Sequence, residues 1–346
     1  MPFEPNRRKF IQISAAGAAL FTMPTGGALA QTNLGKVEYG VASIDAINSV
    51  AYATLKKGFF KQHGLEVNYL NSQSGSRSKQ MLAAGQLFVT TSGASDPIGL
   101  TLAGKPAKLI FGLDQRIPYA NILIRGEDHR SGRIKSLKDL AGKTIAVPQL
   151  QSATWLMATY IADQNGILDQ IDIRGLGDLS TMLGALKSGK VDASIATISM
   201  IDAAIQAGWG HTLFDVTEEA IWNDVFGGDI PGLGCYVLSE TLEKRRDAVQ
   251  AFVSAMSQGQ KVLNDSTPEE IADMIFDEYL TGHDRAAVLR ALNVYKSGVW
   301  SKSNEISSDA YGRLINIMGN GRQFKNEELA GVPYEKLVDM SFLKKA

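Results

Sequence analysis

The sequence predicts an α/β protein built from two similar lobes, and three observations support this prediction. Apolar, strand-like runs alternate with helical stretches across residues 36–240, which is typical of parallel sheets with crossover helices. Gly-Phe-Phe at 58–60 follows one helical stretch, and Gly-Ile-Leu at 166–168 follows another. Leu-Ala-Ala-Gly at 82–85 precedes an apolar run, as does Leu-Lys-Ser-Gly at 186–189. Two modules in the same order predict two lobes, with a cleft of ligand size between them.

The first lobe begins with a strand at 36–42 and a polar turn, followed by a helix that ends at Gly58. The alternating run after it predicts a second strand. A Ser- and Gly-rich loop then leads into a helix that ends at Gly85, because glycine often follows the last helical turn. The further strands expected in this lobe lie at 65–70, 88–91 and 108–113.

The second lobe repeats this order. A short helix is expected at 134–141, and Ser152 is a good N-cap for the helix after the strand that stops at Pro148. Apolar residues at helical spacing precede Gly189, and Thr197 opens a further helix. The strands expected here lie at 144–147 and 193–196.

From Ser239 onward the composition is helical. Two extended stretches, 117–125 and 232–238, are expected to cross between the lobes. Lobe one would then contain residues 33–118 and 237–346, and lobe two residues 119–236.

The N-terminus has the pattern of an export signal. Arg7 and Arg8 precede a weakly apolar stretch at 11–23, and Ala-Leu-Ala at 28–30 is a small-x-small cleavage site. We expect cleavage after Ala30 and export by the twin-arginine route, with a general secretory signal as the alternative. No other stretch approaches the roughly 20 apolar residues that span a bilayer. The remaining chain is therefore expected to be a periplasmic protein, most simply a monomer.

Composition argues against several classes of function. The formal net charge is −1, and removal of residues 1–30, with three basic residues and one acidic residue, leaves it near −3. Nucleic-acid binding, which needs a basic face, is not favoured. Cys235 is the only cysteine, so no internal disulfide is expected, and its apolar neighbours favour a buried small side chain. The four histidines have no metal-ligand spacing, and no nucleophile elbow or phosphate-binding loop is present, so neither catalysis, a metal nor a cofactor is expected.

The candidate binding residues lie in the loops that follow the expected strands, because ligands of open α/β sheets bind beyond the carboxyl ends of the strands. These loops are rich in Ser, Thr and Gly, and most of them open a helix. A helix start presents unpaired N–H groups and a partial positive charge, so several such starts facing one cleft predict an anion site. The candidates are Ser43, Asp45, Ser74, Gly75, Arg77, Ser92, Gly93, Ala94, Ser152, Ala153, Thr154, Trp155, Thr197 and Asp229.

Each charged or aromatic candidate also has a structural interpretation. Arg77 could hold a carboxylate or sulfonate, or lie solvated on a helix. Asp45 could accept a ligand amine or hydroxyl, although capping the next helix is favoured. Trp155 could stack on a ligand or pack in the core, and Asp229 could reach the cleft or form a turn. The serines could equally cap only their own helices.

Several motifs together resemble the nitrate/sulfonate/taurine class of ABC-transporter substrate-binding proteins, to whose superfamily the thiamine-precursor (hydroxymethylpyrimidine) binding proteins belong. The segment AYATLKKGFFKQHGLEV at 51–67 is similar to that family's A-x-x-x-G-F-F-x-x-x-G-L-x-V signature. LKDLAGKTIAV at 137–147 resembles its L-K-D-L-K-G-K-x-I-A-V segment. MLAAGQ at 81–86 resembles its L-x-x-G-x-x-D turn, with Phe88 in place of the usual Asp, and 186–192 repeats that turn with the Asp present.

The resemblance implies a type II periplasmic-binding-protein fold, in which two crossover segments join lobes that close on a ligand, and a membrane permease as partner. By position, the family's ligand contacts would fall at Ser43, Ser74, Ser92, Gly93, Ser152 and Thr197. We expect a small organic anion, a sulfonate or carboxylate, while a neutral pyrimidine-like ring stacked on Trp155 stays open. An enzyme of the thiamine-precursor synthase type is less favoured, since those enzymes carry a cysteine-rich motif. A membrane sensor in place of a permease also stays open.

Overall fold

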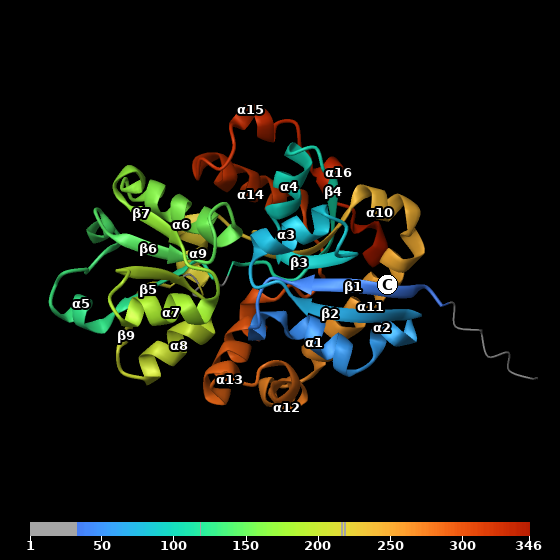
Figure 1. Cartoon of the computed structure of the whole chain (residues 1–346), viewed down its shortest axis with the longest axis horizontal. Helices are drawn as coiled ribbons and strands as arrows, with labels where there is room; N and C mark the ends of the chain where they lie inside the picture. The colour runs from blue at the N-terminus through green and yellow to red at the C-terminus, as the bar shows by residue number, and fades with distance from the viewer. Residues whose placement is uncertain (1–32, 118, 216, 218) are drawn as a thin grey trace, which may run out of the picture. The chain divides into compact units, whose positions relative to one another are not determined.

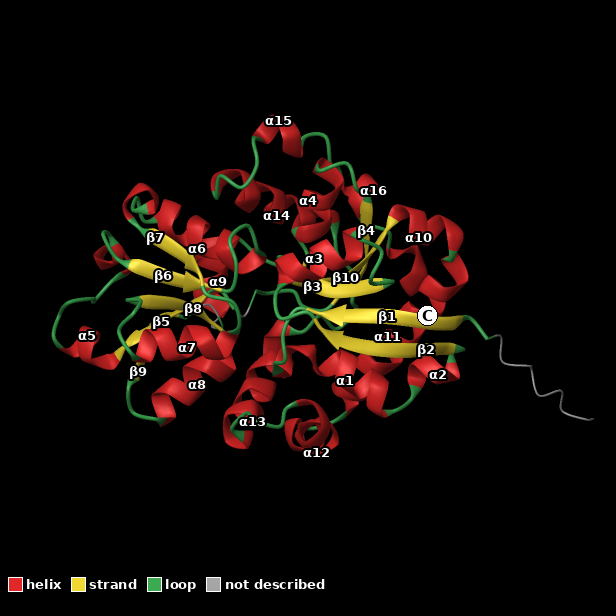
Figure 2. Ribbon diagram, viewed as in Figure 1, coloured by secondary structure: helices red, strands yellow, loops and turns green. Residues whose placement is uncertain are grey.

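The computed structural model describes residues 33–346 except 118, 216 and 218. The expected export signal at 1–30 lies outside the described residues, so it remains a prediction. The described residues form two five-stranded mixed sheets flanked by helices (Figures 1 and 2). This is the α/β architecture with two sheet-bearing halves that the sequence predicts.

The first sheet has the strand order β2-β1-β3-β10-β4. Strand β1 pairs in parallel with β2 and β3, whereas β10 runs antiparallel to both of its neighbours. Its strands are β1 (Gly35–Val41), β2 (Leu65–Asn71), β3 (Val89–Gly93), β4 (Ala107–Gly112) and β10 (Leu233–Leu238).

The second sheet has the order β7-β6-β8-β5-β9. Here β6 pairs in parallel with β7 and β8, and β5 is the antiparallel strand. Strands β6 and β8 were predicted from the sequence, whereas β7, which is mostly exposed, and β9, which is half-buried, were not. Its strands are β5 (Asn121–Arg125), β6 (Thr144–Val147), β7 (Asp172–Gly175), β8 (Ala193–Ala196) and β9 (Gly210–Phe214).

The chain passes between the sheets in two connections, one after β4 and one before β10. The extended stretches expected to form these crossings are mostly strands, β5 and β10, each of which joins the sheet that the chain has just reached. Apolar runs at both places explain why these stretches prefer a sheet to an exposed linker.

Helices follow the parallel strands in both halves. Gly85 and Gly189, which come after α3 and α7, have φ of 71° and 76°, the left-handed conformation that glycine adopts most easily, so both helices end where predicted. The segment expected to be a helix at 134–141 is a short 3₁₀ turn, η2. The helices between the strands are η1 (Ala46–Asn48), α1 (Ser49–Lys56), α2 (Phe59–Gln62), α3 (Gly75–Ala83), α4 (Asp96–Leu102), α5 (Gly126–Arg130), η2 (Leu137–Leu140), α6 (Ala153–Gln164), η3 (Leu168–Gln170), α7 (Leu179–Lys187), α8 (Ile198–Gln206) and α9 (Glu219–Phe226).

The C-terminal segment is helical, as predicted. Helix α11 packs against α1 and α2 of the first half, whereas α13 contacts α8 and α14 contacts α6 in the second half. Its helices are α10 (Ser239–Lys244), α11 (Arg246–Asp265), α12 (Pro268–Tyr279), α13 (Arg285–Val294), the π-helix η4 (Tyr295–Val299), α14 (Ser308–Asn320), α15 (Asn326–Leu329), α16 (Tyr334–Leu337) and η5 (Met340–Lys345).

Candidate ligand-binding site

Three helices from both halves begin at one cavity of about 80 Å³, here called the inner cavity. Each begins at a hydroxyl side chain that caps it. Ser74 Oγ accepts from the Arg77 N–H at 3.2 Å, Ser152 Oγ from the Trp155 N–H at 3.3 Å, and Thr197 Oγ1 from the Met200 N–H at 3.4 Å. The cavity therefore receives the N-terminal ends of α3, α6 and α8.

Eight predicted residues line the inner cavity, and they come from loops of both halves. The first half supplies residues after β1 and β2 and at the last residue of β3, and the second half supplies residues after β6 and β8, as expected for the carboxyl ends of strands. The eight are Ser43, Ser74, Gly75, Gly93, Ser152, Ala153, Thr154 and Thr197.

No charged side chain lines the inner cavity among the described residues. Its polar groups are hydroxyls and the backbone at the helix starts. Each helix start favours a negative group by about 0.3–1 kcal/mol. The cavity can therefore attract an anion without a lysine or arginine, and it can equally hold a neutral polar group.

The two halves touch around the inner cavity. Ser74 Oγ donates to Gln149 Oε1 at 2.8 Å, and Thr197 Oγ1 donates to Asp45 Oδ2 at 3.2 Å. A Cβ built on Gly93 would lie 2.5 Å from the Cβ of Ala153 in the other half. Only glycine at position 93 permits this approach, so the structure has the two halves closed on each other.

Asp45 lies behind the cavity rather than in its lining. Its carboxylate is buried and accepts from the Ile47 N–H at 3.0 Å, the Tyr295 hydroxyl at 3.1 Å and the Thr197 hydroxyl. It caps η1, which was the favoured alternative in the sequence analysis. Burial, and then the nearby Asp45 charge, raises the pKa of Tyr295 well above its ordinary value, so this tyrosine stays a donor.

A second buried acid, Asp96, lies behind Gly75 and Gly93. It accepts from Ser92 Oγ at 2.6 Å, which is also hydrogen-bonded to the Tyr236 hydroxyl at 2.8 Å. Burial raises the pKa of Asp96, against the lowering effect of the Lys79 ammonium 3.7 Å away. Ser92 was predicted to open a helix at the cavity, and this is wrong. It lies within β3 and is fully buried, with its hydroxyl bonded to Asp96 rather than facing the cavity.

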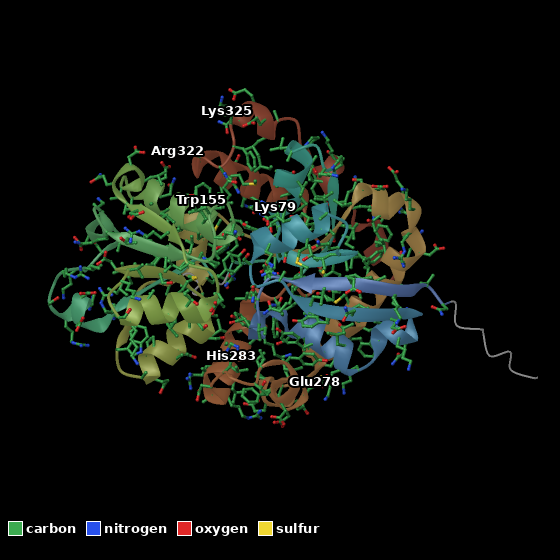
Figure 3. All side chains as sticks on the ribbon, viewed as in Figure 1. Lys79, Trp155, Glu278, His283, Arg322 and Lys325 are labelled. Carbon is green, nitrogen blue, oxygen red and sulfur yellow. The ribbon has the colours of Figure 1, made fainter. Side chains whose placement is uncertain are left out.

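The remaining candidates lie elsewhere. Ala94 is buried outside the lining of the cavity, and Trp155 is a half-buried residue on α6, the helix that packs against α14 (Figure 3). Asp229 lines a separate cavity of about 190 Å³ beside Asp114. Arg77 is exposed, and its Nη1 donates to Gln73 Oε1 at 2.6 Å.

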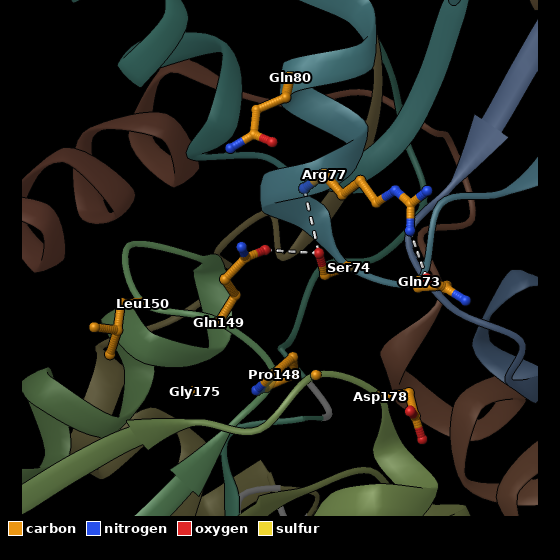
Figure 4. Close-up of a pocket in the computed structure, with 10 residues that line it drawn as sticks. Gln73, Ser74, Arg77, Gln80, Pro148, Gln149, Leu150, Gly175 and Asp178 are labelled. Atoms are coloured by element: carbon orange, nitrogen blue, oxygen red, sulfur yellow. Dashed lines mark hydrogen bonds between the residues drawn. The ribbon is translucent and has the colours of Figure 1, made fainter.

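Arg77 lines a larger cavity of about 680 Å³ between the two halves, here called the outer cavity (Figure 4). The outer cavity shares Ser74 and Pro148 with the inner one. Its walls come from residues 73–80 of the first half and from 148–150 and 175–178 of the second.

Sequence reasoning missed the apolar part of the inner cavity. Tyr119 supplies an aromatic wall, and its hydroxyl donates to the Gly232 carbonyl at 2.9 Å. The only sign of Tyr119 in the sequence was its position in the first connection between the halves. The other missed lining residues are Ala42, Ile47, Pro148, Leu179 and Leu233.

The described part of the chain holds no group of three or more His, Cys, Asp or Glu residues that could bind a metal ion. Cys235 is buried, and burial raises the pKa of its thiol to about 12, which makes it a poor nucleophile. Across the described residues, no helix has the length and apolar character required to cross a membrane.

Comparisons with known proteins agree with this geometry. YtlA of Bacillus subtilis (strain 168) is 20% identical over 343 residues, covering 98% of both chains. A solved structure from Bordetella bronchiseptica RB50 superposes with a TM-score of 0.80 at 20% identity, over 90% of this chain and 96% of that one. The alkanesulfonate-binding protein SsuA of Xanthomonas axonopodis pv. citri, bound to MOPS, gives 0.69 at 16% identity, over 86% and 96%.

The same fold also carries an enzyme. The structure of the desulfurization enzyme DszB superposes with a TM-score of 0.59 at 15% identity, over 90% of this chain and 98% of that chain. Structural likeness at these identities therefore establishes the fold and not the activity.

The family model gives the more specific result. The model described as "NMT1/THI5 like" matches residues 48–271, which include all of the loops that line the inner cavity except the one after β1. This match covers most of the chain. The chain belongs to the NMT1/THI5-like family.

Proposed function

We propose that this chain is the periplasmic substrate-binding component of an ABC importer and that it binds a small organic anion, a sulfonate or carboxylate, between its two halves. The observation that carries the proposal is the meeting of three capped helix starts from both halves at one cavity. A ligand there stabilises the closed form by its difference in affinity for the open and closed forms. A permease would then recognise the closed shape.

The structural similarity to SsuA supports an anionic ligand. SsuA, which shares this fold, is an alkanesulfonate-binding protein seen with MOPS, itself a sulfonate. The inner cavity of about 80 Å³ has room for a head group of a few heavy atoms. The helix starts would attract its charge, while Ser74, Ser152 and Thr197 lie beside it.

Export, processing and domain bounds belong to the same proposal. The signal would be cleaved after Ala30, and the protein would act as a monomer in the periplasm. The expected bounds place 33–118 and 237–346 in lobe one and 119–236 in lobe two, with the two connections acting as the hinge. Because β10 (Leu233–Leu238) pairs with β3 and β4 of the first sheet, we propose that lobe two ends before β10.

A neutral pyrimidine-like ligand is the second candidate, and two observations favour it. Among the described residues the lining has no cationic side chain to pair with an anion, and the buried Asp45 carboxylate lies just behind Thr197. Tyr119 lines the cavity, whereas Trp155 does not, so a ring would stack on Tyr119 and not on Trp155.

A thermal-shift screen of sulfonates, carboxylates, nitrate and pyrimidines on the purified protein separates these candidates. A true ligand at a hundred times its dissociation constant stabilises the folded protein by about 2.7 kcal/mol. We expect sulfonates or carboxylates to raise the melting temperature. If only neutral rings do so, the anion proposal is wrong. If a tested compound is turned over, as DszB suggests is possible for this fold, the binding-protein proposal is wrong.

A further inference from the structure

The outer cavity differs from the inner one in size and chemistry. At about 680 Å³ it is far larger than the inner cavity, and the two share Ser74 and Pro148. The shared residues place the two cavities side by side, so a ligand whose head group fills the inner cavity could extend past Ser74 into the outer one. The Ser74–Gln149 hydrogen bond between the halves lies at this junction.

The walls of the outer cavity come from both halves and combine polar side chains with the apolar Pro148 and Leu150. Figure 4 shows Gln80 on α3 above Gln149 of the second half, with Asp178 on the lower wall. The side-chain amide of Gln80 makes no hydrogen bond within the part of the chain that the structure describes, so its donors and acceptor are free for a ligand. Leu150, an exposed apolar side chain, also lines this cavity.

The outer cavity carries one fixed charge of each sign. Hydrogen bonds from Ser180 and Thr181 lower the pKa of Asp178 to about 2, so it is an anion at neutral pH. The Arg77 guanidinium lines the cavity from the first half. Such a wall complements a ligand tail that is dipolar or rich in hydrogen-bonding groups. It disfavours a tail that adds a second negative charge to the anionic head.

We propose that the outer cavity is a second ligand subsite, which takes a polar or zwitterionic tail of a ligand whose anionic head lies in the inner cavity. Gln80 and Asp178 then determine which ligands sharing one head group are preferred. This inference rests on the proposed function. It adds the substrate class, a sulfonate or carboxylate with a polar tail, and the residues that select it.

The test compares two sulfonates that share a head group, methanesulfonate without a tail and MOPS with a polar morpholine tail. Isothermal titration would measure both on the unchanged protein and on the variants Gln80→Ala and Asp178→Asn. The second variant keeps an N-cap on α7, since Asn caps as well as Asp does. Gln86→Ala, an exposed residue just after α3 that lines neither cavity, is the matched control.

We expect MOPS to bind more tightly than methanesulfonate to the unchanged protein. Each outer-cavity variant should weaken MOPS by about three- to tenfold, the worth of one hydrogen bond, and change methanesulfonate by less than about twofold. Gln86→Ala should change neither. The inference alone fails if both probes bind and the variants affect neither, or affect both equally, or if MOPS has no advantage. If neither probe binds, the proposed sulfonate site fails and the second subsite fails with it.

Discussion

The two halves repeat one plan but place different residues at equivalent helix starts. Helices α3 and α7 have the same length, and each is followed at the same spacing by a left-handed glycine. Ser74 caps α3, whereas Asp178 caps α7. Ser74 lines both cavities, and Asp178 lines only the outer one. A repeated backbone therefore forms a cleft with two unlike walls.

The buried charges are also divided unequally. Asp45 and Asp96 lie behind the inner cavity in the first half, whereas the second half presents the neutral caps Ser152 and Thr197. An anionic group is stabilised by helix starts from both halves, whereas an ionised acid behind the cavity would repel it from the first half only. We therefore expect it to lie nearer the second half, over the starts of α6 and α8.

Replacing Asp45, a buried acid of the first half, should have the largest effect on stability. Asp45→Ala removes a buried acceptor and leaves the Tyr295 and Thr197 hydroxyls without their partner. We expect the free energy of unfolding to fall by about 3 kcal/mol, because buried groups left unpaired are costly. Urea unfolding at pH 7 measures it. A loss under about 1 kcal/mol would mean that the carboxylate is not an essential acceptor in the fold.

Crowding the contact between the halves should mainly reduce ligand affinity. A methyl group on Gly93 would meet the Cβ of Ala153, which cannot move without its backbone, so Gly93→Ala opposes closure. Overpacking of this kind costs about 1–3 kcal/mol, or five- to 150-fold in affinity for a ligand that needs the closed form. Titration of the ligand found in the screen measures it.

A second, compensating substitution distinguishes an effect of Gly93→Ala on closure of the two halves from an effect on folding. Gly93→Ala combined with Ala153→Gly moves the methyl group to the other half and should restore most of the affinity. If the double variant binds as poorly as the single one, Gly93 acts on the fold of β3 and not on the contact between the halves.

The sequence predicted the repeated plan because that plan depends on local signals. Apolar runs, N-caps and the glycines at 85 and 189 act over a few residues, and the structure confirms them. Strands β7 and β9 were missed because β7 is mostly exposed and β9 is half-buried along its whole length, which leaves no strong period of two.

The site was less predictable because its composition depends on contacts between distant loops. The caps Ser74, Ser152 and Thr197 were identified from their own helices. Whether a neighbouring residue lines the cavity depends on the other half. Ser92 turns inward to Asp96, which no sequence pattern encodes. Tyr119 reaches the cavity from the first connection, and its position in the chain was the only signal for it.

Asp114 and Asp178 should change the pH dependence of stability in opposite directions. Asp114 in the first connection accepts from the Gly232 and Leu233 N–H groups, and burial raises its pKa to about 8. The folded state then holds a proton that the unfolded state has lost above about pH 4. Stability should therefore fall as pH rises toward 8, by up to about 1.4 kcal/mol per pH unit. Asp178, with its lowered pKa, should lose its contribution only as pH falls from about 4 to 2.

Urea midpoints at pH 6 and pH 7.5 measure this response in the unchanged protein and in Asp114→Asn. We expect the difference between the two pH values to shrink in the variant, which has no proton to lose at that position. An equal difference in both proteins would show that Asp114 is ionised throughout this range.

The smallest expected effect separates the two equivalent caps from each other. Ser74→Ala and Asp178→Ala each remove one cap from a helix of the same length, so each should lower the free energy of unfolding by about 1 kcal/mol. Only Ser74 lines the inner cavity, so only Ser74→Ala should also weaken methanesulfonate, by a few-fold. Titration of methanesulfonate after matched urea unfolding tests both parts. If both variants weaken methanesulfonate equally, Ser74 has no special role in binding the head group. The difference between the caps Ser74 and Asp178 then has no consequence for where the head group binds.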